Sequence, residues 1–143
     1  LMNIPVALIS TSPKDMLDRP ATLDWLRRHG VHTAGEPCTG YLFCGEPVAL
    51  ELPLSSCNNE AAVRRLTANG GLLLLNPIPE KERVQDRSIL VDAIKAGKQA
   101  EAEGHYYHPA ANGEIDRRTG GYSSRIQLES IQQNYLLAKS IMD

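Results

Sequence analysis

The chain has 143 residues, of which 42% are hydrophobic and 22% are charged, and this suits one domain with an ordinary apolar core. Its formal net charge of −2 carries no bias towards a nucleic-acid polymer or an anionic membrane. The longest apolar run, residues 72–75, is far shorter than a membrane span and fits a buried strand instead.

The first half of the sequence predicts short strands that alternate with helices. Apolar runs bounded by turn residues indicate strands at residues 6–9, 31–34, 41–44 and 48–52. A helical turn is expected over residues 13–17, because a Ser-Pro pair is typical of a helix start, and Pro20 interrupts it. A second helix is expected over residues 21–29, with Gly30 as its stop.

The middle of the chain predicts a helix followed by a buried strand. Asn58 or Asn59 is expected to cap a helix that runs to about residue 67. The strand at residues 72–75 then stops at the Asn-Pro-Ile-Pro segment of residues 76–79, because proline removes ladder donors and restricts its neighbour.

The last third predicts longer helices. One is expected over residues 86–103, whereas residues 105–118 stay ambiguous because they contain a proline and an interior glycine. After a turn at residues 119–121, Ser123 or Ser124 is expected to cap a final helix that ends near residue 142. The expected buried positions of that helix are Ile126, Leu128, Ile131 and Leu137. Since strands alternate with helices, the expected fold class is α/β, a layered sheet with flanking helices.

The three cysteines indicate reduced thiols and a cytoplasmic protein. Cys38, Cys44 and Cys57 are odd in number, show no disulfide framework and form no CxxC pair for zinc. No secretory signal is visible, and the chain enters an apolar strand almost at once, as expected of a start inside a domain.

Lys14 is the most informative ionisable residue. It follows a predicted strand and lies in the first turn of a predicted helix, where the positive end of the helix dipole disfavours an ammonium. Partial burial would disfavour the charge further, and both effects favour the neutral amine that attacks a carbonyl. The alternative, which position alone favours, is a solvated surface lysine.

Two further segments are candidate binding sites. Asn76 directly follows a buried strand, and ligands of α/β sheets bind beyond the carboxyl ends of strands, although a rigid turn is the plainer interpretation. The Thr-Gly-Gly segment of residues 119–121 precedes a helix and offers free N–H groups for a phosphate or a base carbonyl, or is only a turn.

Four segments in the same order resemble the pseudouridine-5′-phosphate glycosidases. Residues 69–80 resemble the family's Asn-Gly-Gly, apolar strand and Asn-Pro-Ile-Pro-Glu run, and residues 13–18 resemble its Ala-Lys-Ser-Ile-Leu-Asp segment. Residues 42–44 resemble its aromatic-Cys strand, and residues 119–128 its closing Thr-Gly-Gly and Asn-Ile-x-Leu helix. The resemblance covers nearly the whole chain.

The resemblance implies a reaction and a set of site residues. The family reversibly cleaves the C–C glycosidic bond of pseudouridine 5′-phosphate to uracil and ribose 5-phosphate, with a divalent metal, typically manganese. A family lysine forms a Schiff base with C1′ of the opened ribose, and the iminium supplies the electron sink that breaking a C–C bond requires; Lys14 occupies its position. The substrate-binding residues that we expect are Asn76, Ser123, Ser124 and Arg125.

The sequence also departs from the family. The family's acidic metal ligands and several phosphate contacts lie upstream of the segment that matches residues 13–18, so residues 1–143 are expected to be the C-terminal portion of one family domain. We therefore expect the metal ligands outside this chain, a missing N-terminal portion as a partner, a homo-oligomer, and no activity of the chain alone. Arg125 matches the family's uracil-contacting Asn, and either it changes base recognition or it swings out so that Ser123, Ser124 or Gln127 lines the pocket.

Two other functions stay open. Arg125 motivates the first, a divergent C-glycoside synthase or an inactive paralogue, and the second is a non-catalytic α/β binding or assembly domain. A small-molecule nucleotide, and neither a nucleic-acid polymer nor a membrane, is the expected partner.

Overall fold

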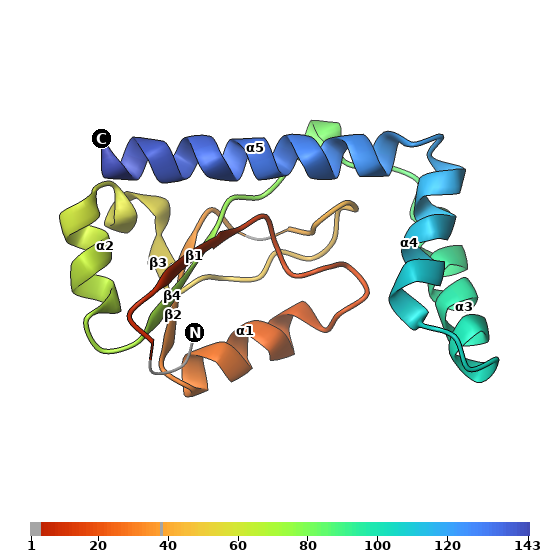
Figure 1. The fold of residues 1–143 in the computed structure, drawn as a ribbon, viewed down its shortest axis with the longest axis horizontal. Coiled ribbons are helices and arrows are strands. Elements are labelled where there is room, and N and C mark those ends of the chain that lie inside the picture. Colours follow the sequence, from red (N-terminus) through yellow and green to blue (C-terminus); the bar gives the residue numbers. More distant parts are fainter. Residues whose placement is uncertain (1–3, 38) are drawn as a thin grey trace.

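A parallel sheet forms the centre of the computed structural model, which describes residues 4–37 and 39–143. Its four strands lie in the order β1 (Ala7–Ser10), β4 (Gly71–Leu75), β2 (Val31–Gly35) and β3 (Leu52–Pro53). The register places Leu8 of β1 and Thr33 of β2 on either side of Leu73. The predicted α/β class is therefore confirmed (Figure 1).

β4 is the most deeply buried strand, because both of its faces are covered. On one face, Leu73 and Leu75 pack against Leu23 of α1 (Arg19–Arg28). On the other, Leu72 and Leu74 pack with residues of α2 (Glu60–Thr67) and with Ile141 of α5 (Tyr122–Met142). All its residues are buried, as is typical of a central parallel strand, and Figure 1 shows α5 and α1 on opposite faces of the sheet.

The helix ends near the sheet follow the expected capping chemistry. The carboxylate of Asp18 accepts the N–H of Ala21 at 2.9 Å and begins α1, and Gly30, with φ of 74°, lies just beyond its end. Asn59 begins α2 by accepting the N–H of Ala62 at 2.9 Å. The prediction that Pro20 interrupts a helix is wrong. Pro20 lies in the first turn of α1, where its missing N–H costs nothing.

A helical hairpin stands beside the sheet and resolves the ambiguous segment. It consists of α3 (Ser88–Ala102) and α4 (Tyr107–Arg118), so the long helix predicted over residues 86–103 is confirmed. Pro109 is the third residue of α4, where helix N–H groups have no partner within the helix and a proline is tolerated.

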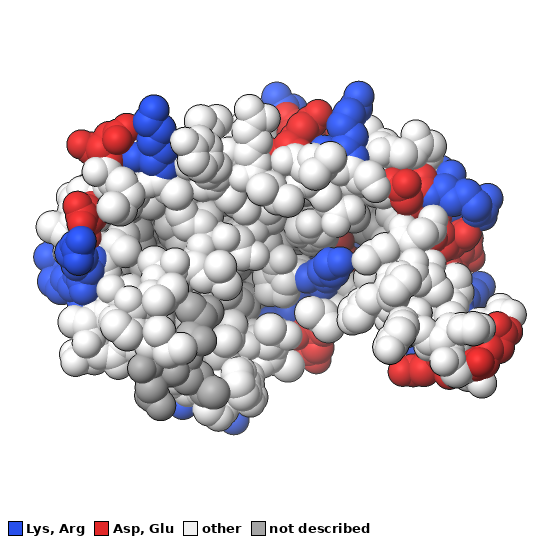
Figure 2. Space-filling view, in the orientation of Figure 1, with Lys and Arg blue, Asp and Glu red and all other residues white. Residues whose placement is uncertain are grey.

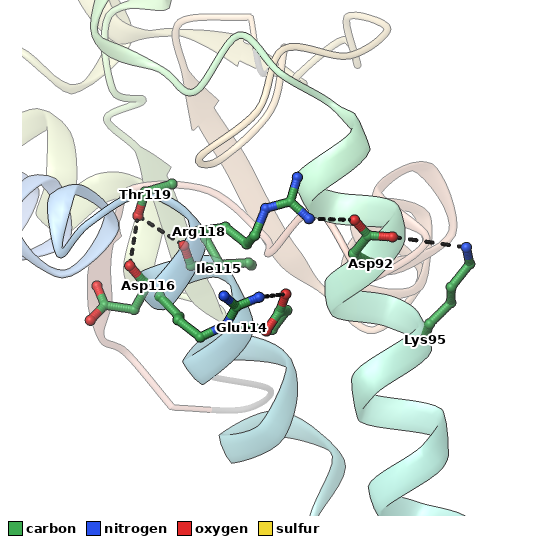
Figure 3. A network of polar contacts seen from close by, with 8 residues as sticks. Asp92, Lys95, Glu114, Ile115, Asp116, Arg118 and Thr119 are labelled. Atoms are coloured by element: carbon green, nitrogen blue, oxygen red, sulfur yellow. Dashed lines mark hydrogen bonds and ion pairs between the residues drawn. The ribbon is translucent and has the colours of Figure 1, made fainter.

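Apolar contacts hold the hairpin to the rest of the fold. They form one buried cluster of Leu42, Phe43, Ile78, Ile89, Leu90, Ala93, Ala111, Ile115 and Ile126. At the surface, Arg118 pairs with Asp92 at 2.6 Å, and the Asp92 carboxylate also faces Lys95 (Figure 3). These ion pairs are partly exposed, so the apolar cluster contributes most of the stability. Among the described residues, no helix is both long and apolar enough to cross a membrane.

Some predicted elements are wrong. Residues 13–17 form a turn closed by the N–H of Leu17 on the carbonyl of Lys14, and not a helical turn. Residues 41–44 contribute a bridge between Phe43 and Val84, and residues 48–52 join the sheet through the two-residue strand β3, with one further bridge position at Val48. The physical reason for the first lost strand is that its N–H groups bind a carboxylate, as described below.

The final helix is confirmed in extent but differs in detail. Gly121, with φ of 82°, occupies its N-cap position, so Ser123 and Ser124 lie within the first turn. Ile126 is buried as predicted, whereas Leu128 and Ile131 are exposed, because α5 meets the sheet and the hairpin along one face only.

Two glycines in the hairpin should respond oppositely to substitution. A Cβ at Gly97 would lie 2.6 Å from the ring of Tyr107, so Gly97→Ala should lower the free energy of unfolding by about 1–2 kcal/mol through overpacking. A Cβ at Gly113, in the interior of α4, would meet no atom within 4 Å, so Gly113→Ala should raise it by about 0.5–1 kcal/mol through helix propensity. Urea denaturation measures both, and equal effects would contradict the packing of Tyr107 on Gly97.

Candidate functional site

The candidate site lies at the carboxyl edge of the sheet, where β1 and β4 end side by side. Because the strands are parallel neighbours, Thr11 after β1 and Asn76 after β4 come to the same edge, and the N–H of Asn76 donates to the carbonyl of Ser10 at 2.8 Å. This edge is where ligands bind in open α/β sheets.

A polar network ties α5 to this edge. The Asn76 amide donates to Asn134 at 3.1 Å, and Asn134 donates to the hydroxyl of Thr11 at 3.2 Å. Thr11 in turn donates to Ser130 at 3.1 Å, and Ser130 donates to the carbonyl of Gln127 at 2.8 Å. Thr11 and Ser130 are buried, so breaking the network would leave polar groups without partners inside the fold.

Asn76 and Ser130 open onto a cavity of about 500 Å³ between the segment after β4 and α5. Its other polar lining residues are Glu82, Glu129, Gln132 and Gln133. Amides and hydroxyls that present both donors and acceptors suit a small polar ligand.

Lys14 lies in a second, small cavity close to the same edge. It is half-buried and shares this cavity, of about 10 Å³, with Tyr41, Asn112 and the core residues around them. None of the ion pairs among the described residues includes Lys14. The helix dipole expected at Lys14 is missing, because the next helix along the chain, α1, begins only at Arg19.

Asp15 shapes the surroundings of Lys14. Its carboxylate accepts the N–H groups of Tyr41, Leu42 and Phe43 at 2.8, 2.7 and 3.1 Å. A side chain at Gly40, where φ is 144°, would collide with the carbonyl of Phe43, so glycine lets the loop fold this tightly. The loop is thereby bound to the residue next to Lys14.

Tyr41 connects the two cavities. Its hydroxyl donates to the Gln127 side-chain carbonyl at 3.2 Å, so the polar network reaches from the cavity of Lys14 to that of Asn76. Burial, and then the negative charge of Asp15, raise the pKa of the Tyr41 hydroxyl. Tyr41 is therefore a neutral hydrogen-bond donor over the whole physiological pH range.

Arg83 is a buried cation that holds two loops together beside the site. Its Nε donates to the carbonyl of Ile78 at 2.8 Å, and its Nη1 donates to the hydroxyl of Thr39 at 2.6 Å. Sequence reasoning did not single it out, because residues 80–83 alternate in charge as a solvated segment would.

The predicted site residues at the start of α5 lie in two environments. Ser123 is buried, and its hydroxyl donates to the Asp116 carboxylate at 2.9 Å, which also accepts the N–H of Ser124 at 3.1 Å. The side chain of Arg125 is 67% exposed, pairs with Glu129 at 3.8 Å and lies over the ring of Tyr122. The polar network around Thr11 and Asn76 includes neither Ser124 nor Arg125, so their roles in substrate binding stay predictions.

Several residues of the network are not singled out by the sequence alone. These are Thr11, Asp15, Tyr41, Ser130 and Asn134. One signal was present, because Gln127, Ser130 and Asn134 are spaced to share one face of a helix, and a polar stripe on a buried face indicates a partner.

Within residues 4–37 and 39–143, no group of three or more His, Cys, Asp and Glu side chains is placed to hold a metal ion. The donor set therefore does not fit a complete metal site. Cys44 and Cys57 are free thiols, burial raises the pKa of Cys57, and Cys38 lies outside the described residues.

A protein-family model described as indigoidine synthase A-like protein matches residues 1–142. The chain belongs to this indigoidine synthase A-like family. Curated relatives named pseudouridine-5′-phosphate glycosidase support the resemblance found in the sequence. Those of Geobacillus kaustophilus, Escherichia coli and Saccharopolyspora erythraea are 25%, 28% and 30% identical, covering 95%, 99% and 99% of this chain but 48%, 48% and 50% of their own lengths. This family member thus spans about half the length of the relatives it matches.

Solved structures share the fold. An indigoidine synthase A-like protein of Thermotoga maritima superposes with a TM-score of 0.70 at 20% identity, covering 98% of this chain and 50% of that one. A prealnumycin C-glycosynthase in complex with ribulose 5-phosphate superposes with a TM-score of 0.62 at 23% identity, covering 94% and 46%. At these identities the likeness supports the architecture of the family member.

The cap at Asp116 predicts a pH-dependent stability. Hydrogen bonds from Ser124 and Ser123 lower the pKa of Asp116, so its contribution is present above the unfolded value, near 4, and is lost as the pH falls through the lower folded value. Asp116→Ala should lower the melting temperature at pH 7, and the difference from the wild type should shrink towards pH 2. Asp24→Ala, which removes only an exposed ion pair with Arg28, is the matched control and should change little. An equal loss for Asp116→Ala at both pH values would contradict the cap.

Proposed function

We propose that the chain supplies the lysine-bearing half of a pseudouridine-5′-phosphate glycosidase, which reversibly forms uracil and ribose 5-phosphate. The observation that carries this proposal is the half-buried Lys14, without an ion-pair partner in the described part of the chain, in a cavity that Tyr41 links to Asn76. The names of the relatives support the substrate class.

The chemistry proposed for Lys14 is imine formation. Its Nζ condenses with the aldehyde carbon C1′ of the opened ribose, and water leaves. The protonated imine then accepts the electron pair of uracil C5, which loses its proton as the C–C bond forms. The 4′-hydroxyl of the ribose next displaces the lysine nitrogen from C1′ and gives up its proton, which closes the furanose ring and releases the free amine. Cleavage is the reverse: Nζ displaces the ring oxygen from C1′, the electrons of the C–C bond return to uracil as the imine forms, C5 regains a proton, and water releases ribose 5-phosphate and the free amine.

The surrounding residues would orient the substrate. We propose that Asn76 and Gln127 face its polar groups, since an amide offers both a donor and an acceptor, and that Ser123 and Ser124 act mainly by fixing the start of α5. Tyr41 would hold Gln127 in one orientation.

The remaining parts of the proposal concern what lies beyond this chain. A divalent metal, manganese by resemblance, would be held by acidic residues outside this chain. The chain alone is proposed to be inactive, with or without added manganese, and the completed protein to be a cytoplasmic homo-oligomer.

Arg125 motivates the second candidate function, a divergent C-glycoside synthase. Arg125 stands where the family has the Asn that contacts uracil, and its side chain pairs with Glu129 and lies over Tyr122. The pocket would then lack the amide that binds uracil, so the enzyme would join the sugar to a different carbon nucleophile. Product analysis of the completed enzyme with uracil and with other carbon nucleophiles separates this reaction from the first.

Lys14 should be the residue that is trapped as an imine. In the chain completed with the rest of the family domain, ribose 5-phosphate and borohydride should add a stable adduct to one lysine, detected by peptide mass spectrometry. Lys14→Ala should abolish the adduct, whereas Lys95→Ala, which removes an exposed lysine of α3, should leave it unchanged. Undiminished trapping in Lys14→Ala would refute the assignment.

Gln127 should matter more than Arg125 for turnover. Gln127→Ala removes the amide that binds Tyr41 and should lower kcat/KM for pseudouridine 5′-phosphate at least tenfold, about 1.4 kcal/mol of transition-state stabilisation. Arg125→Asn should change kcat/KM by less than about twofold, because the guanidinium points to solvent. A tenfold rise for Arg125→Asn would instead place residue 125 in the base pocket.

A further inference from the structure

β1 has one free edge. It is the outermost strand of the sheet and pairs only with β4 among the described strands. The carbonyls of Val6 and Ser10 point towards β4, where they accept the N–H groups of Leu72 and Asn76. Because backbone groups alternate in direction along a strand, the N–H and carbonyl groups of Ala7 and Ile9 point to the other side, where no described strand receives them.

One face of β1 is also bare. Leu8 lies opposite Leu73, on the side of the sheet that α1 covers, but α1 packs chiefly over β2 and Leu8 is not part of the cluster around Leu23. The residues Ile4, Val6 and Leu8 are therefore 52%, 46% and 48% exposed. Ile9, on the opposite face, packs in the cluster that contains Leu137 and Ile141 of α5.

Nothing in the sequence protects this edge against association. Residues 4–10 contain no charged side chain, and Pro5 is their only residue of the kinds that usually blunt edge strands. β1 lies in front of the other strands in Figure 1, and Figure 2 shows that the same face carries its Lys, Arg, Asp and Glu mainly near the rim. A bare edge and a bare apolar face together indicate a surface that another polypeptide covers.

We propose that this edge surface, the free side of β1 with Ile4, Val6 and Leu8, is the docking site for the remainder of the family domain. The occupant would add a strand beside β1 and lay an apolar layer over Leu8 next to α1. A short peptide would satisfy only the edge, whereas the relatives are about twice as long as this chain and contain enough residues for both. The proposal rests on the incompleteness included in the proposed function, but not on the reaction of Lys14.

Hydrogen exchange tests the proposal without measuring activity. Residues 1–143 would be fused behind the part that precedes the matching segment in each of the relatives from Geobacillus kaustophilus, Escherichia coli and Saccharopolyspora erythraea. In at least one fused chain, the amides of Ala7 and Ile9 should exchange at least tenfold more slowly than in the isolated 143-residue chain. Leu8→Lys should restore fast exchange in that fused chain, whereas Leu128→Lys, an exposed position on α5, should not.

Three outcomes would overturn the proposal. The first is that no fused chain slows exchange at Ala7 and Ile9. The second is that Leu8→Lys leaves the slowed exchange unchanged. The third is that the isolated chain already protects these amides as a dimer, measured by light scattering, which would make a second copy the occupant. A fused chain that protects β1 but shows no imine trapping would support this interface and reject the proposed reaction.

Discussion

The carboxylate of Asp15 organises the part of the fold on which the candidate site depends. By accepting three successive N–H groups of residues 41–43, it removes them from any sheet and turns an apolar segment into a tight loop. That loop delivers Leu42 and Phe43 to the cluster beneath the helical hairpin and Tyr41 to the cavity of Lys14. The Asp15 carboxylate thus connects the hydrophobic core to the cavity of Lys14, because its hydrogen bonds hold the loop of residues 41–43 against the segment that carries Lys14.

The same interaction explains where sequence reasoning succeeded and failed. Helices α1 and α2 and strands β2 and β4 follow from local signals, namely cap residues, a stop glycine and a continuous apolar run, and all of these are read within a few residues. The fate of residues 41–44 depends on a partner more than twenty residues away in sequence, and no local pattern reveals it. The α4 helix likewise forms because α3 offers it a surface, despite a weak intrinsic preference.

The candidate site was predictable in its location but only partly in its members. The end of β4 identified Asn76, because the carboxyl edge of a parallel sheet is a general place for ligands. The side chain that binds Asn76 and Thr11 is Asn134 of α5, which is the last helix of the chain. It is polar, whereas the sequence predicts that apolar residues form the buried face of this helix. Leu128 and Ile131 were assigned to the core for this reason, although the buried face of α5 is partly built from Ser123 and Ser130.

The length of α5 has a mechanical consequence. A helix of 21 residues extends about 31 Å, and this one is attached to α4 by the Asp116 carboxylate at its start and to the sheet cluster by Ile141 near its end. The polar side chains that bind Thr11 and Asn76 lie between these two attachments. Since a helix is stiff along its axis, a tilt of the hairpin formed by α3 and α4 would move the middle of α5 relative to the ends of β1 and β4.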